Sequence, residues 1–120
     1  MSGTPRLAAP ARVLFVAGYV LVTALSVLPA EELPDVGLWD KAQHFLAWAA
    51  LGLTGGAGWP ARPATWRIVW FLLVSGVALE AIQLFVPGRI FAVGDGVANL
   101  AGVLAGIALA LALARKPAAG

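Results

Sequence analysis

The sequence predicts an all-α membrane protein, built as a single bundle of four transmembrane helices. Apolar residues make up 61 % of the 120 residues and charged residues only 12 %, whereas a soluble domain usually carries about 25 % charged residues. The mean hydropathy is +0.89. Four apolar stretches fill most of the chain and the segments between them are short. We therefore expect one domain over residues 1–120.

The first predicted span covers residues 13–28 and ends at Pro29. It is short, because a spanning helix needs about 17–25 residues. Two arginines before a short apolar run are also typical of a signal peptide, with Ala24-Leu25-Ser26 as a poor cleavage site. The apolar run continues past that site, which favours a retained span, but cleavage stays an open alternative.

The second and third spans are each followed by proline. The second covers residues 42–58, and Pro60 and Pro63 indicate that the helix stops there. The third covers residues 68–86 and ends at a Pro-Gly pair. Tryptophans near the ends of membrane helices are typical interfacial anchors, and we expect that role for Trp39, Trp48, Trp59, Trp66 and Trp70.

The fourth span, residues 93–114, consists almost entirely of Ala, Leu, Gly and Val. Small residues recur in it at intervals of four, at Gly94, Ala98, Gly102 and Gly106. This spacing allows close approach of another helix backbone. That helix could belong to the same chain or to a second copy in a homodimer, and the sequence leaves both possibilities open.

The basic residues predict the orientation of the bundle. Six of them lie in the two tails and in the 59–67 loop, which are Arg6, Arg12, Arg62, Arg67, Arg115 and Lys116. The opposite side carries Lys41 and Arg89 beside several acidic residues. The positive-inside rule then places both termini in the cytoplasm. Because the basic residues are dispersed over segment ends, we expect no nucleic-acid partner.

Polar residues gather at the outer ends of the last three spans. They are Asp40, Lys41, His44, Glu80, Gln83, Arg89, Asp95 and Asn99. Charged groups in or near hydrocarbon are costly and usually have a function. Spacings of three or four put the members of each span on one helix face, and a rise of 1.5 Å per residue puts three of them about 6–10 Å below the outer boundary. We therefore predict a polar pocket near the outer leaflet, with the three faces turned toward each other.

These residues form an ordered pattern. It reads D-K-x-x-H-F at 40–45, Trp48, L-G at 51–52, E-x-x-Q at 80–83, F-V-P-G-R at 85–89, D-x-x-x-N at 95–99 and Gly102. The pattern resembles the VanZ-like family of small bacterial membrane proteins, named for a protein associated with low-level teicoplanin resistance. The resemblance covers about residues 38–106. It carries the family's motif positions onto Asp40, Lys41, His44, Glu80, Gln83, Pro87, Gly88, Arg89, Asp95 and Asn99.

This chain departs from the family at a few positions. Trp48 stands where the family commonly has Tyr, and Ala92 and Gly96 lie in a stretch that often reads differently. The polar set is intact. The resemblance implies a bacterial inner-membrane location and a link to the cell envelope and glycopeptide resistance. It implies no reaction.

Three roles are open for the polar set. Arg89 and Lys41 could hold an anion, because a guanidinium suits phosphate, so we expect a membrane lipid or lipid-linked cell-wall precursor as the partner. Glu80 and His44 are the candidates for general acid and base in an enzyme, although we expect binding rather than catalysis. The whole set could instead pair internally and fix the helix packing. No cofactor and no metal ion is expected.

Overall fold

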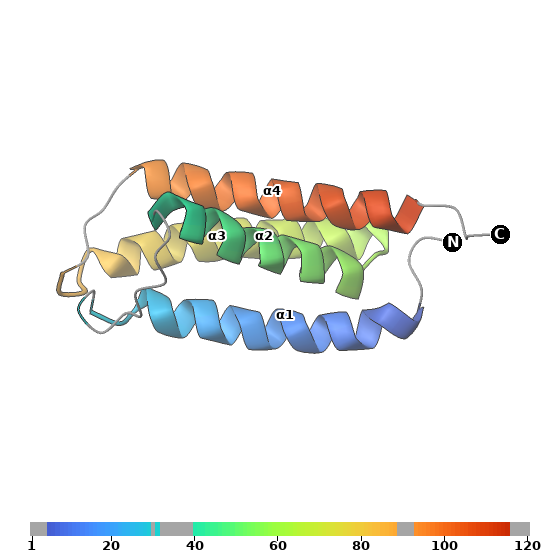
Figure 1. Ribbon diagram of the computed structural model, residues 1–120, viewed down its shortest axis with the longest axis horizontal. Helices are drawn as coiled ribbons and strands as arrows, with labels where there is room; N and C mark the ends of the chain where they lie inside the picture. Colours follow the sequence, from blue (N-terminus) through green and yellow to red (C-terminus); the bar gives the residue numbers. More distant parts are fainter. Residues whose placement is uncertain (1–4, 30, 32–39, 89–92, 116–120) are drawn as a thin grey trace.

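The computed structural model describes residues 5–29, 31, 40–88 and 93–115, and these form an all-α bundle. The helices are α1 (Pro5–Ser26), α2 (Asp40–Gly58), α3 (Arg62–Gln83) and α4 (Val93–Arg115). They run along one common axis, and the start of α1, the end of α2, the start of α3 and the end of α4 share one end of the bundle (Figure 1). The predicted fold class is confirmed.

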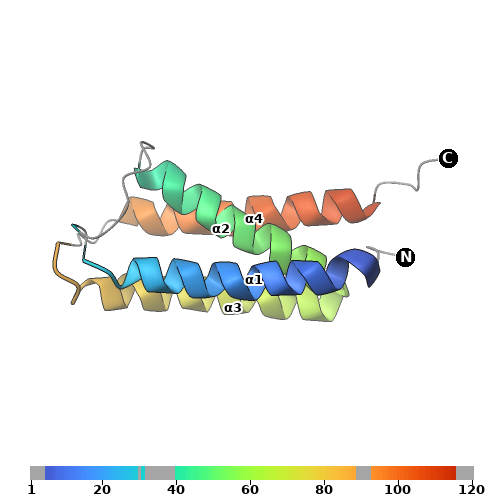
Figure 2. The ribbon, with the colours of Figure 1, turned by 60° about the horizontal axis from the view of Figure 1, so that its bottom comes forward.

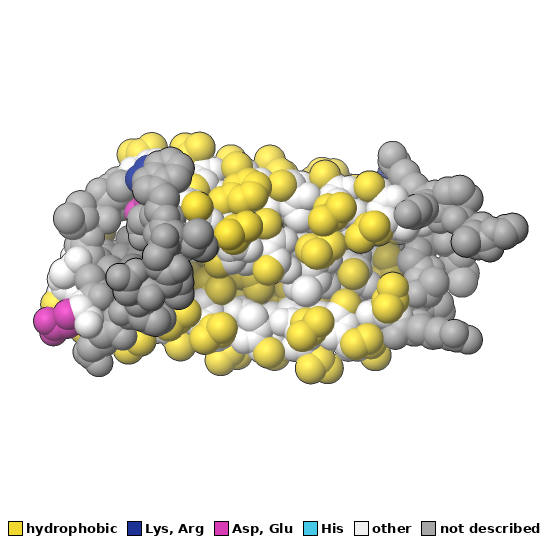
Figure 3. Space-filling view, in the orientation of Figure 1, with side chains coloured by type: hydrophobic (Ala, Val, Ile, Leu, Met, Phe, Trp, Pro, Cys, Tyr) yellow, Lys and Arg dark blue, Asp and Glu magenta, His cyan; other side chains and the backbone are white. Residues whose placement is uncertain are grey.

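Three helices are long and apolar enough to cross a membrane, at Leu7–Ser26, Arg62–Gln83 and Val93–Ala114. At 1.5 Å per residue they reach about 30–33 Å, which matches a hydrocarbon core of about 30 Å. Hydrophobic side chains cover the middle of the visible face (Figure 3). These features make the chain a membrane protein.

Helix α2 is not one of these three spans. It is the innermost helix of the bundle and contacts each of the other helices. It packs most extensively against α4 and next against α1, and it crosses the bundle obliquely (Figure 2). Its first turns carry the polar residues of the D-K-x-x-H motif, which lowers its hydropathy. Because α2 is largely enclosed by protein, it needs a less apolar surface than its neighbours do.

Glycines bring α2 and α4 into close contact. A Cβ built on Gly102 would meet the backbone of Phe45 and Ala49, and one on Gly106 would meet the backbone of Ala49 and Leu53. The small-residue face of α4 therefore packs against a helix of the same chain, one of the two alternatives that the sequence left open. A homodimer stays a prediction, and it would need a surface other than these two buried glycines.

The buried core lies where all four helices meet. Its largest fully buried side chains are Leu51, Leu72 and Val103. Trp48 belongs to this core as well, with only 3 % of its surface exposed, so the expectation that it anchors the chain at the membrane interface was wrong. Trp66 and Trp70 are more than half exposed, as an anchor requires.

Two helix starts differ from the prediction. Helix α1 begins at Pro5 rather than at 13, because the alanines before the apolar run are strong helix formers. Helix α3 begins at Arg62 rather than at 68. The proline that was expected only to end the preceding helix, Pro63, lies in the first turn of α3, where its missing N–H costs nothing. The 59–67 segment is thus mostly helix.

Helix α3 ends at Gln83, three residues before the predicted end. Leu84, Phe85 and Val86 continue as successive turns whose N–H groups donate to the third residue back. Gly88 follows Pro87 with φ of 77°, a left-handed conformation that glycine adopts without steric cost. This turn ends the helical path before the chain reaches α4.

Candidate functional site

A polar network joins the first turns of α2 and α4. Lys41 Nζ lies 3.4 Å from Asp95 Oδ1, and His44 Nδ1 lies 3.0 Å from Asn99 Oδ1. His44 Nε2 lies 3.9 Å from the second oxygen of Asp95. Because an amide oxygen only accepts, the bond to Asn99 places a hydrogen on His44 Nδ1. Four of the predicted site residues thus come together.

The local sequence explains this network. Asp95 and Asn99 are four residues apart and share the face of α4 that meets α2. Both are buried, at 8 % and 7 % exposed. Gly94 leaves the room that Lys41 occupies, since a Cβ there would lie 2.5 Å from Lys41 Cε. Asp95 is also the acidic residue in the first turn of α4, where a carboxylate suits the positive end of the helix dipole.

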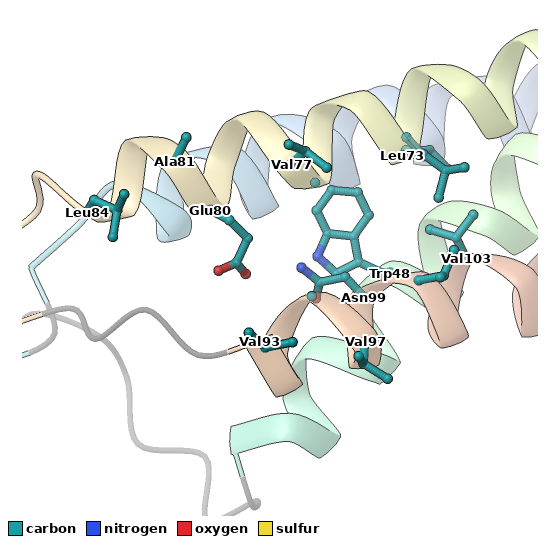
Figure 4. Close-up of a pocket in the computed structure, with 14 residues that line it drawn as sticks. Trp48, Leu73, Val77, Glu80, Ala81, Leu84, Val93, Val97, Asn99 and Val103 are labelled. Carbon is teal, nitrogen blue, oxygen red and sulfur yellow. The ribbon is translucent and has the colours of Figure 1, made fainter.

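A groove of about 610 Å³ separates α3 from α4, and Trp48 of α2 forms its floor (Figure 4). Its fourteen lining residues are Trp48, Leu72, Leu73, Gly76, Val77, Glu80, Ala81, Leu84, Val93, Gly96, Val97, Asn99, Leu100 and Val103. Twelve of them are apolar, aromatic or glycine, and only Glu80 and Asn99 are polar. The groove exists because α3 contacts α4 much less extensively than α2 does.

Glu80 brings an acidic group into the groove. Figure 4 shows its side chain extending from α3 toward Asn99 on α4, with the Trp48 ring beside them. Glu80 lies in the last turn of α3, which contains no basic residue. Its carboxyl oxygens are hydrogen-bond acceptors that lie near the negative end of the helix dipole of α3.

Gln83 does not join this group. Its Nε2 donates to the backbone oxygen of Ser26 at 3.1 Å, so it faces α1. Further along the same side of α3, the hydroxyls of Tyr19 and Ser75 lie 2.8 Å apart. Glu80 and Gln83 were predicted to share one inward face, but they contact different neighbours. The polar contacts of α3 are therefore divided between the groove and the α1 side.

Two predicted site residues cannot be placed in this arrangement. Arg89 and the side chain of Asp40 lie outside the described residues, so their predicted ligand contacts stay predictions. Within the described ranges, no three His, Asp or Glu side chains gather closely enough to hold a metal ion.

The geometry separates two chemical roles. His44 does not line the groove, and its ring nitrogens face Asn99 and Asp95. These contacts place His44 in the α2–α4 network, and its predicted role as a general base stays a prediction. Glu80 and Asn99 do line the groove and can hydrogen-bond a ligand there. Asn99 belongs to both sets and connects them.

Sequence reasoning missed the twelve groove residues other than Glu80 and Asn99, and two of them, Trp48 and Gly96, show why. Trp48 was expected at the interface, and Gly96 was noted only as a departure from the family pattern. A Cβ built on Gly96 would meet nothing within 4 Å, so this glycine contributes open space to the groove wall. The sequence signal for Gly96 was a glycine among residues with larger side chains. That signal indicates a groove only when it is known that α3 lies opposite Gly96.

Comparisons with known proteins agree with the motif pattern. The family model described as VanZ/LLP1 matches residues 10–114, which covers most of the chain. Searches of curated proteins and of solved structures gave no match. The match includes all four helices apart from the first residues of α1 and the last of α4. The chain therefore belongs to the VanZ-like family of membrane proteins.

Proposed function

We propose that this protein binds an anionic amphiphile of the bacterial cell envelope, such as a phospholipid or a lipid-linked cell-wall precursor. The single observation that carries the proposal is the groove between α3 and α4. It is a cavity of about 610 Å³, within the size range of small-molecule sites, and it lies between two helices that are both apolar enough to span a membrane.

The apolar walls of the groove suit the hydrocarbon part of such a molecule. Val77, Val97 and Leu100 line it and are also substantially exposed on the outside of the bundle. A chain from the surrounding bilayer can therefore enter sideways, between α3 and α4. Apolar contact within membranes is driven by close packing, which a groove with a glycine in each wall, Gly76 and Gly96, permits.

The polar head would lie beyond the groove at the Lys41 end of the bundle. The Lys41 side chain is 36 % exposed and pairs with Asp95 in the first turn of α4. Arg89 is the second cation that we assign to the anion, on the sequence pattern alone. The positive-inside rule puts this end at the outer leaflet of the inner membrane, where envelope precursors and phospholipid headgroups meet the protein.

A groove-filling substitution tests the proposal. Gly96→Leu places a side chain into open space and raises helix propensity, so the protein should fold. Ala101→Leu is the matched control, because Ala101 is exposed on α4 and does not line the groove. Native mass spectrometry with phosphatidylglycerol measures binding. We expect Gly96→Leu to weaken binding at least about tenfold, a loss of about 1.4 kcal/mol, and Ala101→Leu to bind like the wild type.

The proposal fails if Gly96→Leu folds normally and binds phosphatidylglycerol as the wild type does. The family link to teicoplanin gives a second measurement in cells that depend on this protein. Gly96→Leu should change glycopeptide susceptibility, and Ala101→Leu should not. Unchanged susceptibility in a strain whose susceptibility responds to deletion of the gene would count against a role of the groove in resistance.

A structural role is the second candidate, and the α2–α4 network favours it for part of the polar set. Lys41, His44, Asp95 and Asn99 contact one another, and buried pairs of this kind can specify how helices pack. On this reading, His44→Ala lowers the thermal stability of the protein in detergent without a separate loss of lipid affinity. A folded His44→Ala protein that has lost lipid binding would contradict it.

A further inference from the structure

We infer that the first turns of α3 bind the headgroup of an anionic phospholipid from the surrounding bilayer. The site consists of Arg62, Trp66, Arg67 and Trp70, on the outside of the bundle. It lies at the end opposite the first turn of α2, where the Lys41 network is (Figure 1). The inference concerns a second lipid site and does not rest on the groove between α3 and α4.

The four side chains share one exposed face of α3. At about 100° per residue, Trp66 and Trp70 lie about 40° and 80° around the helix from Arg62, and Arg67 lies at about 140°. The two tryptophans are therefore flanked by the two arginines. All four residues are exposed, Trp66 at 58 % and Trp70 at 65 %, and the buried residues of α3 occupy its other side.

Every available hydrogen-bonding group on this face is a donor. Within the described part of the chain, these four side chains make no hydrogen bond and no ion pair. A guanidinium and an indole N–H donate and cannot accept. The one other polar side chain between residues 61 and 71 is Thr65, which is buried and donates to the backbone oxygens of Trp59 and Ala61. A ligand of this face must therefore supply acceptors.

The charge of this face calls for an anion. No acidic residue lies between residues 41 and 79. A third arginine at this end, Arg12, is used inside the bundle: its Nε donates to the Gly58 oxygen at 2.7 Å, and its guanidinium lies 5.2 Å from the centre of a Trp59 ring. Arg62 and Arg67 have no such contact. A phosphate suits them, because it can accept two parallel hydrogen bonds from a guanidinium.

The depth of the residues favours a phospholipid over a free phosphate. Indoles lie preferentially at the level of lipid headgroups. Arg62 and Arg67 are about 7.5 Å apart along the helix, close to the thickness of one headgroup layer, about 5–8 Å. Beyond the tryptophans the same face continues with Val74, which is 63 % exposed and apolar. A phospholipid offers a phosphate to the arginines and a hydrocarbon chain to Val74, whereas a free phosphate would use the arginines alone.

The two positive charges select the kind of headgroup. A zwitterionic headgroup carries an ammonium group, which two guanidinium groups repel. Phosphatidylglycerol carries its phosphate without a cation. We therefore expect this face to bind phosphatidylglycerol at least about fivefold more tightly than phosphatidylcholine.

Native mass spectrometry with these two lipids tests the inference. All proteins carry Gly96→Leu, so that a lipid in the groove does not contribute to the measured affinity. An arginine near an anionic membrane surface gains about fivefold in affinity. The double change of Arg62→Gln and Arg67→Gln should therefore weaken phosphatidylglycerol binding about 25-fold and abolish the preference over phosphatidylcholine.

The matched control is the double change of Arg6→Gln and Arg115→Gln. It removes two positive charges from the same end of the bundle, at the start of α1 and the end of α4. We expect it to change the affinity by less than about threefold.

Two results would overturn the inference. One is unchanged binding of phosphatidylglycerol after both changes on α3. The other is an equal loss in the control, because the attraction would then belong to the whole end of the bundle. If circular dichroism shows that the α3 double variant does not fold, Arg67→Gln alone takes its place, with an expected loss of about fivefold, and unchanged binding in it would refute the site. None of these results bears on the proposed function, which compares Gly96→Leu with the wild type.

Discussion

Replacing Gly106 by alanine tests the close packing of α2 and α4. A Cβ at this position would collide with the backbone oxygen of Ala49 and lie 2.6 Å from the backbone nitrogen of Leu53. Both atoms belong to the α2 backbone, so no side-chain rotation relieves the contact. The backbone of α2 or α4 must therefore shift at this contact.

The change in the free energy of unfolding is the difference between two opposing effects of the new methyl group. Overpacking a close contact costs about 1–3 kcal/mol, and Gly→Ala within a helix gains about 0.5–1 kcal/mol. We expect Gly106→Ala to lower the free energy of unfolding by about 1–2 kcal/mol. Gly96→Ala is the matched control on the same helix. Its new Cβ meets nothing within 4 Å, so only the gain of up to about 1 kcal/mol remains.

Reversible unfolding in mixed micelles, followed by circular dichroism, measures both variants against the wild type. The expected order of stability is Gly96→Ala at or above the wild type and Gly106→Ala below it. If Gly106→Ala is as stable as Gly96→Ala, α2 and α4 are not in backbone contact at this glycine, and the packing described for them is wrong.

Three further predictions concern the polar contacts. The Tyr19 and Ser75 hydroxyls, 2.8 Å apart, should show a coupling of about 0.6 kcal/mol in a double-mutant cycle of Tyr19→Phe and Ser75→Ala, the average for membrane proteins; additive effects would refute the bond. A double-mutant cycle of Lys41→Met and Asp95→Asn should give a coupling energy of less than about 1 kcal/mol, because the Lys41 side chain is 36 % exposed. A much larger coupling energy would mean that the pair is shielded from water. Arg12 Nε donates to the last carbonyl of α2 at 2.7 Å. Arg12→Ala should therefore lower the free energy of unfolding by about 1 kcal/mol, measured by thermal denaturation. An unchanged melting temperature would contradict that contact.

The fold could be predicted because hydrophobicity and helix-breaking residues are local signals. The apolar runs gave the helices, and Pro87 with Gly88 gave the end of α3 to within three residues. The starts were harder, because Pro63 can end one helix or begin the next, and only the packing of the following residues decides between the two. Helix α1 extends beyond its apolar run for a similar reason, since alanine is helical with or without a membrane around it.

The candidate site was predictable where one helix face meets its nearest partner. The spacing of Asp95 and Asn99 predicted one face of α4, and the structure brings that face to Lys41 and His44. The groove was not predictable in the same way. It depends on how far α3 stands from α4, and the periodicity within one helix does not encode the distance between two helices.

Gln83 shows the same limit of spacing arguments. It lies three residues from Glu80, but a difference of three positions still rotates a side chain by about 60° around the helix. With α1 on one side of α3 and the groove on the other, that rotation is enough to send the two side chains to different neighbours. Two residues three positions apart therefore contact the same neighbour only when one helix covers both of their side chains.

The most direct test of the account is to locate a bound hydrocarbon chain. A phospholipid with a photoreactive diazirine in its acyl chain is added to the purified protein in detergent at one molecule per protein, irradiated, and mapped by mass spectrometry. The account predicts adducts on the facing stripes of α3 and α4, at Leu73, Val77, Val97 and Leu100, and their loss in Gly96→Leu but not in Ala101→Leu. Adducts spread evenly over exposed residues of α1, such as Val13 and Val16, and unchanged in Gly96→Leu would contradict it.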